Sequence, residues 1–166
     1  MIGNTCLNLA LKQREFEDDI DLFVTSLSPL IDEDKIRESA YRNGWSVGFT
    51  ELGTLSLVLN IENTDIKVDL YENIHDFYIP NEALDICKRR IVVEGTEINY
   101  VAVECWAVFK AKRGSNQDLF SLSKLKVFVD EGEIKLDLGL MRKIAELYED
   151  ESRFIYDRLR ALGFKV

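Results

Sequence analysis

The sequence predicts an α+β fold, in which a mixed β-sheet comes first and a C-terminal bundle of helices follows. Short runs of alternating apolar and polar residues fill much of 45–72, whereas apolar residues recur at helical spacing from Val103 onward. The hydrophobic content is 46% in a chain of 166 residues, which is enough for a packed core. The predicted architecture therefore places a sheet before a layer of helices.

The first third of the chain predicts a helix, a strand and a second helix. Residues 4–13 place Leu7, Ala10 and Leu11 at helical spacing, and Asn4 or Thr5 could cap this helix. A buried strand is expected at 19–25. An acidic first turn and the pair Asn43-Gly44 mark a helix over 32–45.

The remaining elements follow from turn residues and periodicity. Strands are predicted over 45–52, 54–61 and 66–72, and the short link of Asn63 and Thr64 indicates a hairpin. A helix over 81–90 precedes a second hairpin around Glu94-Gly95. Helices are then predicted over 103–113, 116–129, 138–149 and 151–162. We expect two domains, a core over 1–101 and a helical region over 102–166 that packs on it.

Composition narrows the range of functions. The net charge of −9 disfavours general nucleic-acid binding, although basic runs such as Lys88-Arg89-Arg90 could form a local path. No apolar run approaches the roughly 20 residues that cross a membrane, and no signal peptide is apparent. The three cysteines, which are far apart, predict buried, reduced thiols in a cytoplasmic protein. His75 is the single histidine, which disfavours a histidine-based zinc site or catalytic triad.

The stretch DDIDLFV, residues 18–24, contains the strongest chemical signal. In a strand, Asp19 and Asp21 project to the same side while Ile20 faces the core. Two carboxylates so close repel each other, and a divalent cation such as Mg²⁺ would relieve that repulsion. Asp69, on the polar face of the strand over 66–72, could complete a metal-binding triad. The alternative interpretation is that Asp18, Asp19 and Asp21 merely end a loop.

The wider stretch GNTCLNLALKQREFEDDIDLF resembles the signature of the nucleotidyltransferase fold, in which a glycine-led helix precedes a DxD strand. By pattern it is most similar to the AbiEii-type toxin family and small nucleotidyltransferases near it. The matching positions are Gly3, Thr5, Leu7, Leu9, Arg14, Asp19, Ile20, Asp21, Leu22 and Phe23. Downstream, VDLY at 68–71 resembles the strand that carries the third carboxylate. Residues 103–125 resemble the family's helix-loop-helix segment, with matches at Lys110, Arg113 and Asp118.

This resemblance implies transfer of a nucleoside monophosphate from an NTP to an acceptor, which could be RNA, a protein or a small molecule. Asp19 and Asp21 would hold one or two Mg²⁺ or Mn²⁺ ions, and Asp69 would ligate the second ion or deprotonate the attacking hydroxyl. The triphosphate would contact Gly3, Asn4 and Thr5. Lys110 would face the phosphates in the same cleft, and Asp118 would orient Lys110 or the acceptor.

Three differences from the family pattern keep other functions open. Asn4 replaces the second small residue of the glycine pair, and Ser121 stands where a second acidic residue often follows Asp118. The pattern also places a helix and a strand before Gly3. A catalytically degenerate protein that keeps the fold as a binding or regulatory module is therefore the main alternative. A plain interaction module is a second alternative, and the sequence leaves the NTP, the acceptor, any toxin-antitoxin pairing and the oligomeric state open.

Overall fold

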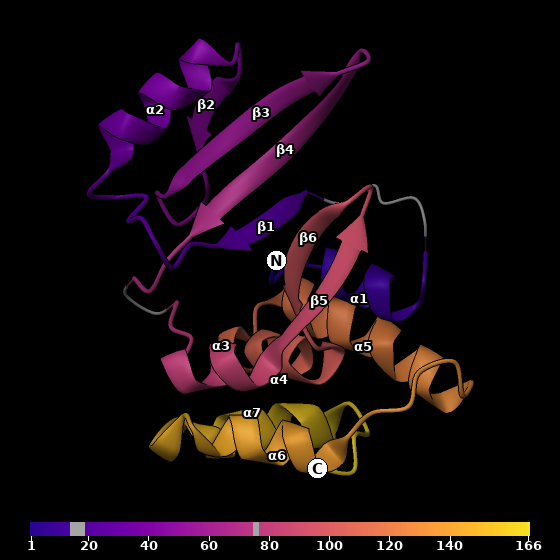
Figure 1. The fold of residues 1–166 in the computed structure, drawn as a ribbon. Coiled ribbons are helices and arrows are strands. Elements are labelled where there is room, and N and C mark those ends of the chain that lie inside the picture. Colours follow the sequence, from indigo (N-terminus) through magenta and orange to yellow (C-terminus); the bar gives the residue numbers. More distant parts are fainter. Residues whose placement is uncertain (14–18, 75–76) are drawn as a thin grey trace. The chain divides into compact units, whose positions relative to one another are not determined.

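The structure is a computed structural model that describes residues 1–13, 19–74 and 77–166 (Figure 1). Contacts divide the chain into two compact units. The first unit contains Met1–Thr5 and Glu15–Tyr78, and the second contains Cys6–Arg14 and Ile79–Val166. We call them the sheet unit and the helical unit. Arg14, Asp18 and His75, which the sequence analysis singled out, lie outside the described residues.

The sheet unit contains a mixed four-stranded sheet. Its strands are β1 (Ile20–Phe23), β2 (Ser46–Phe49), β3 (Leu55–Ile61) and β4 (Thr64–Tyr71), in the spatial order β1-β4-β3-β2. β1 runs parallel to β4, and the other neighbours are antiparallel. Glu62 and Asn63 link β3 to β4 with φ values of 51° and 66°. Two positive φ values are typical of a hairpin turn that matches strand twist, so the predicted hairpin forms with its link one residue earlier.

Helix α2 (Glu33–Arg42) packs on one face of this sheet (Figure 1). Its buried Ala40 contacts a cluster that includes Leu55, Leu57 and Leu70, and all three leucines are at most 8% exposed. The helix ends at the predicted signal, because Asn43 is its C-cap and Gly44 has a φ of 74°. Since side chains alternate along a strand, the residues between these leucines point to the opposite face.

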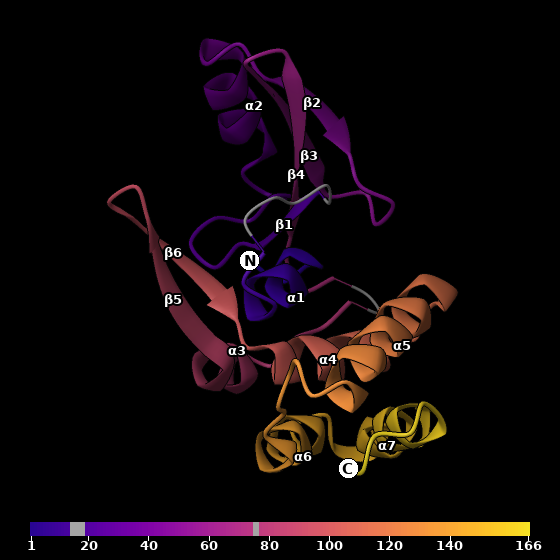
Figure 2. The same cartoon turned by 90° about the vertical axis from the view of Figure 1, so that its right-hand side faces the viewer.

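The helical unit is built around α4 (Val103–Arg113). α5 (Asn116–Asp130), α6 (Leu138–Glu146) and α7 (Ser152–Ala161) all contact it, and α6 and α7 also contact each other (Figure 2). The unit also contains α3 (Asn81–Cys87), a hairpin of β5 (Lys88–Val93) and β6 (Thr96–Val101), and the short 3₁₀ helix Glu149–Glu151. Fully buried side chains form the core of the unit: Trp106, Val108, Leu122, Leu125, Met141, Ile144, Ile155 and Leu159.

The predicted fold class is confirmed, since the described residues form an α+β structure with seven α-helices, a mixed sheet and C-terminal helices. Helix α1 (Thr5–Ala10) is shorter than predicted, and no described helix is long and apolar enough to span a membrane. The predicted helix over 81–90 is wrong beyond Cys87, because Lys88 begins β5. The division into domains 1–101 and 102–166 stays a prediction.

The expectation of three reduced thiols is wrong for two of them. Cys87 at the end of α3 and Cys105 in α4 form a disulfide, with their Cα atoms 5.9 Å apart. This separation is ordinary for a disulfide, and the sequence spacing gave no indication of it. Cys6 lies outside this disulfide and is buried, as predicted.

Candidate functional site

Strand register aligns Asp21 with Asp69 in the sheet unit. The two residues are direct partners in the parallel pair of β1 and β4, and Ser56 of β3 is the partner of Asp69 on its other side. Side chains at partner positions point to the same face, so these three form a polar row across neighbouring strands. Their alternation with Leu55, Leu57 and Leu70 places the row on the face opposite α2.

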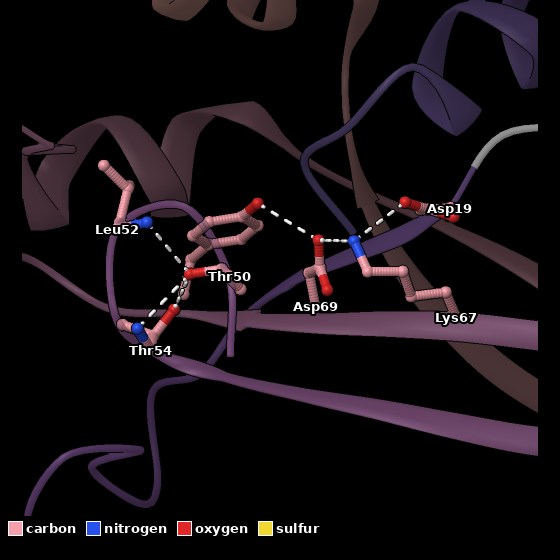
Figure 3. A network of polar contacts seen from close by, with 7 residues as sticks. Asp19, Thr50, Leu52, Thr54, Lys67 and Asp69 are labelled. Carbon is pink, nitrogen blue, oxygen red and sulfur yellow. Dashed lines mark hydrogen bonds and ion pairs between the residues drawn. The ribbon is translucent and has the colours of Figure 1, made fainter. Parts of the chain in front are cut away.

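Lys67 joins this face to Asp19, which lies just before β1. The Lys67 Nζ atom is 3.0 Å from Asp19 Oδ2 and 2.8 Å from Asp69 Oδ2, so the ammonium lies between two carboxylates (Figure 3). Tyr71 Oη also donates to Asp69 Oδ2, over 3.4 Å. The hydrogen bond to Asp69 raises the pKa of Lys67 above its ordinary 10.5; partial burial opposes this rise, and the bond to Asp19 adds to it. The lysine is therefore a firmly charged partner of both carboxylates.

Several buried oxygens on the sheet unit have no hydrogen-bond partner among the residues that the structure describes. They include Asp69 Oδ1, Ser56 Oγ and Thr5 Oγ1, on side chains that are at most 5% exposed. Asn4 Oδ1 is a fourth such atom. Unpartnered buried polar atoms are costly and are commonly satisfied by water, an ion or a ligand. Asp69 thus offers one oxygen to Lys67 and retains another that no described protein group contacts by a hydrogen bond.

Gly3 lies directly against the Asp21 side chain. A Cβ atom at Gly3 would lie 1.8 Å from Asp21 Oδ2 and 2.8 Å from Asp21 Cβ, far inside van der Waals contact. The Ile2 amide also donates to the Asp21 carbonyl over 2.9 Å, which holds the N-terminal segment beside β1. Glycine at position 3 therefore permits the close approach of the segment that contains Asn4 and Thr5 to the Asp21 carboxylate.

The structure brings two of the three aspartates of the predicted metal triad to one lysine and places the third in register with one of them. Asp19 and Asp69 meet through Lys67, and Asp21 is the register partner of Asp69. Across residues 1–13, 19–74 and 77–166, no group of three or more His, Cys, Asp or Glu side chains is close enough to hold a metal ion. The donor set nevertheless suits a hard cation, because carboxylate oxygens already converge on one cationic group and Asp69 Oδ1 is unpartnered. Metal ligation by the three aspartates stays a prediction.

In the helical unit, Lys110 and Asp118 meet as the sequence analysis anticipated. Lys110 Nζ lies 3.1 Å from Asp118 Oδ1, with the two side chains 13% and 0% exposed. Lys110 also lies over the ring of Trp106, 5.8 Å from its centroid. Arg113 donates to both oxygens of the same carboxylate, from Nε over 2.6 Å and from Nη2 over 2.5 Å. Two cations therefore converge on one buried carboxylate.

Asp118 has a structural role that the sequence analysis missed. It occupies the third helical position after Ser115, and the two residues form a reciprocal capping box at the start of α5. Burial by itself would raise the pKa of Asp118. Hydrogen bonds from Arg113 and Ser115 outweigh this effect of burial, and the positive charges of Lys110 and Arg113 act in the same direction as the hydrogen bonds. Together they lower the pKa of Asp118 from 3.8 to about 2. The spacing Ser-x-x-Asp was the available signal for this cap.

Comparison with family models decides the family. Residues 1–161 match the model described as "Nucleotidyl transferase of unknown function (DUF2204)". The chain belongs to this nucleotidyltransferase family. No curated protein and no solved structure gave a match. The family match covers nearly the whole chain and agrees with the predicted nucleotidyltransferase resemblance, without indicating an AbiEii-type protein in particular.

Two residues on the face of the sheet that carries Asp69 were not identified from the sequence. Lys67 shares a face with Asp69 because the two are two positions apart in β4, and this spacing was a usable signal. Ser56 had no local signal, since its place beside Asp69 depends on the register between β3 and β4. The roles of Gly3, Asn4, Thr5, Lys110 and Asp118 in binding or catalysis stay predictions.

Proposed function

We propose that this protein is a divalent-metal-dependent nucleotidyltransferase that moves a nucleoside monophosphate from an NTP to an RNA, protein or small-molecule acceptor. The observation that carries this proposal is the alignment of Asp21 with Asp69 on the face of the sheet opposite α2, with Asp19 joined to Asp69 through one cationic group. Membership of a nucleotidyltransferase family supports the reaction class. A closer kinship with AbiEii-type toxins is part of the same proposal.

The reaction sets clear demands on the residues of the sheet unit. Asp19, Asp21 and Asp69 would hold Mg²⁺ or Mn²⁺, which supplies charge neutralisation at the transferring phosphate. An acceptor hydroxyl attacks the α-phosphorus, the bond to the β-phosphate oxygen breaks, and pyrophosphate leaves. Asp69 would either ligate the ion or accept the hydroxyl proton, and its buried Oδ1, which has no partner among the described residues, is the oxygen available for either role.

The phosphates need further donors. In this proposal the backbone at Gly3 and the side chains of Asn4 and Thr5 contact the triphosphate. The buried oxygens of Asn4 and Thr5, for which the described part of the chain provides no hydrogen-bond partner, support such a role. Lys110 supplies a fixed cation for the phosphates, and Asp118, at 3.1 Å, orients the Lys110 ammonium.

Removing the Asp69 carboxylate tests the proposal. Purified protein is incubated with Mg²⁺, each α-labelled NTP and pools of RNA, protein and small-molecule acceptors, and transferred label and released pyrophosphate are measured. We expect Asp69→Asn to lose about a hundredfold or more of the transfer rate, the size typical of a lost general base. Asp65→Asn is the matched control, because Asp65 is an exposed residue of the same strand that accepts from Asn60 over 2.7 Å.

Nucleotide binding is measured separately by thermal unfolding with Mg²⁺ and each NTP. A ligand at about 100 times its Kd should stabilise the fold by roughly 2.7 kcal/mol. Equal transfer by wild type and Asp69→Asn, or no transfer with any acceptor pool, would contradict the catalytic proposal.

A second candidate function is a binding or regulatory module that keeps the fold without catalysis. The observation that favours it is Lys67, which neutralises part of the carboxylate charge without any metal ion. This function predicts NTP-dependent stabilisation of the wild-type protein with no label transferred to any acceptor.

A further inference from the structure

We propose that Lys67 is a displaceable internal cation that competes with the divalent ion for Asp19 and Asp69. In the metal-free protein its ammonium neutralises the carboxylates, and a metal ion binds only when the ammonium moves away. Lys67 thereby sets the affinity of the protein for metal. This inference rests on the proposed metal-dependent function and adds a mode of regulation to the same site.

The contact geometry makes the two cations mutually exclusive. Lys67 Nζ lies 3.0 Å from Asp19 Oδ2 and 2.8 Å from Asp69 Oδ2, which are the oxygens that would also ligate the metal. An ion bound to either oxygen would lie within a few ångströms of the ammonium. Like charges at that distance repel strongly at a partly buried site. The ammonium must therefore leave as the ion arrives.

The side chains of Asp69 and Lys67 differ in their freedom to move. The Asp69 side chain is 6% exposed and short, so the fold fixes its position. The Lys67 side chain is 41% exposed, and its long stem can lie along the strand while the ammonium turns to solvent. Lys67 is consequently the group that moves, and its departure leaves the leucine cluster on the other face of the sheet undisturbed.

The second oxygen of Asp69 supports an exchange of cations. Lys67 and Tyr71 both contact Oδ2, whereas Oδ1 is buried and has no hydrogen-bond partner within residues 1–13, 19–74 and 77–166. A single ammonium thus satisfies only part of the hydrogen-bonding capacity of this carboxylate. A divalent ion has a higher charge and takes more oxygen ligands, so it can use an oxygen that the lysine leaves unpaired.

The test is metal binding in the absence of nucleotide. Mn²⁺ is titrated into each protein, and free Mn²⁺ is measured from its electron paramagnetic resonance signal. We expect Lys67→Met to bind Mn²⁺ about tenfold or more tightly than wild type, because a nearby positive charge has been removed. Lys35→Met is the control, since Lys35 is an exposed lysine of the same unit that pairs with Asp32. Its Mn²⁺ affinity should equal that of wild type.

Two further variants keep the result interpretable. Lys67→Arg keeps the positive charge and should retain the wild-type affinity for Mn²⁺, whereas Asp69→Asn in the Lys67→Met background should abolish the gain in affinity. If Lys67→Met fails to fold, Lys67→Gln replaces it. A Lys67→Met or Lys67→Gln protein that binds Mn²⁺ no more tightly than wild type would overturn the inference, as would no binding by any variant.

The outcomes separate this inference from the proposed reaction. Tighter Mn²⁺ binding by Lys67→Met, with no label transfer by any protein, would support Lys67 as a competing cation and contradict the catalytic function. Label transfer by wild type, with no gain of Mn²⁺ affinity in Lys67→Met, would support the catalytic function and overturn the role of Lys67.

Discussion

At the scale of single residues, Gly3 illustrates how a missing side chain shapes the face of the sheet opposite α2. We call this face, which carries Asp21 and Asp69, the acidic face. The Asp21 carboxylate occupies the space that a Cβ atom at position 3 would need. From the sequence, Gly3 was predicted to contact the triphosphate instead. The close approach to Asp21 was not predictable, because it depends on the Ile2 segment lying beside β1.

Gly3→Ala should destabilise the sheet unit by about 1–3 kcal/mol, the usual cost of forcing atoms into filled space. The clash involves Asp21 Cβ as well as the carboxylate, so rotation of the side chain alone does not relieve it. Urea unfolding of the full chain measures the change. Gly48→Ala is the control, because nothing lies within 4 Å of a Cβ at Gly48 and its stability should change little. Equal stabilities of the two variants would contradict the contact.

At the scale of elements, the connection between α4 and α5 is held by several interlocking contacts. Gly114 ends α4 with a φ of 66°, and the Arg158 guanidinium donates to the carbonyls of Ala111 and Lys112 over 2.7 Å each. The capping box of Ser115 and Asp118 then begins α5. This short connection therefore fixes the position of Lys110 relative to Asp118.

Asp118 should make the stability of the protein depend on acidic pH. The pKa of Asp118 in the folded protein is about 2, below the ordinary 3.8. The stabilisation that its carboxylate gives the folded state is therefore fully present above pH 3.8 and is lost as the pH falls through about 2. The difference between these two pKa values corresponds to about 2 kcal/mol in the free energy of unfolding. Unfolding of Asp118→Asn by urea between pH 5 and pH 2 should show a shallower loss of stability than wild type. Asp157→Asn, at an exposed position of α7, should keep the wild-type slope.

Elements with a complete local signal were predicted well. The strand at 19–25, the helix over 32–45 and the four C-terminal helices all appear close to their predicted places. The end of the helix predicted over 81–90 was wrong because no residue in its local sequence indicates that the helix ends at Cys87. Lys88–Val93 pairs instead with Thr96–Val101. Pairing partners outweigh local propensity in such short segments.

At the scale of the whole molecule, the disulfide joins two parts of the helical unit, α3 and α4, across 18 residues of sequence. We expect reduction to lower the free energy of unfolding by about 3 kcal/mol, because an open loop regains conformational entropy in the unfolded chain. Thermal unfolding with and without a phosphine reductant measures the effect. Denatured, unreduced protein should expose one thiol, Cys6, to a maleimide reagent, and reduced protein should expose three. Three reactive thiols before reduction would contradict the disulfide.

The acidic face was predictable in part. The DxD pattern and the alternation around Asp69 predicted which aspartates share a face, because strand periodicity is a local property. Lys67 and Ser56 were missed because their contacts depend on side-chain reach and on strand register. The disulfide was missed for the same reason, since cysteine spacing alone does not reveal which thiols meet in space.

The register between β1 and β4 has a consequence for how this chain can vary in length. Because faces alternate with a period of two, the acidic face depends on parity: inserting one residue into β4 before Asp69 would turn its carboxylate toward the leucines under α2. Insertions in the connections outside the strands carry no such penalty. Length variation compatible with the fold should therefore concentrate between the strands, while the count of residues within β1 and β4 stays constant.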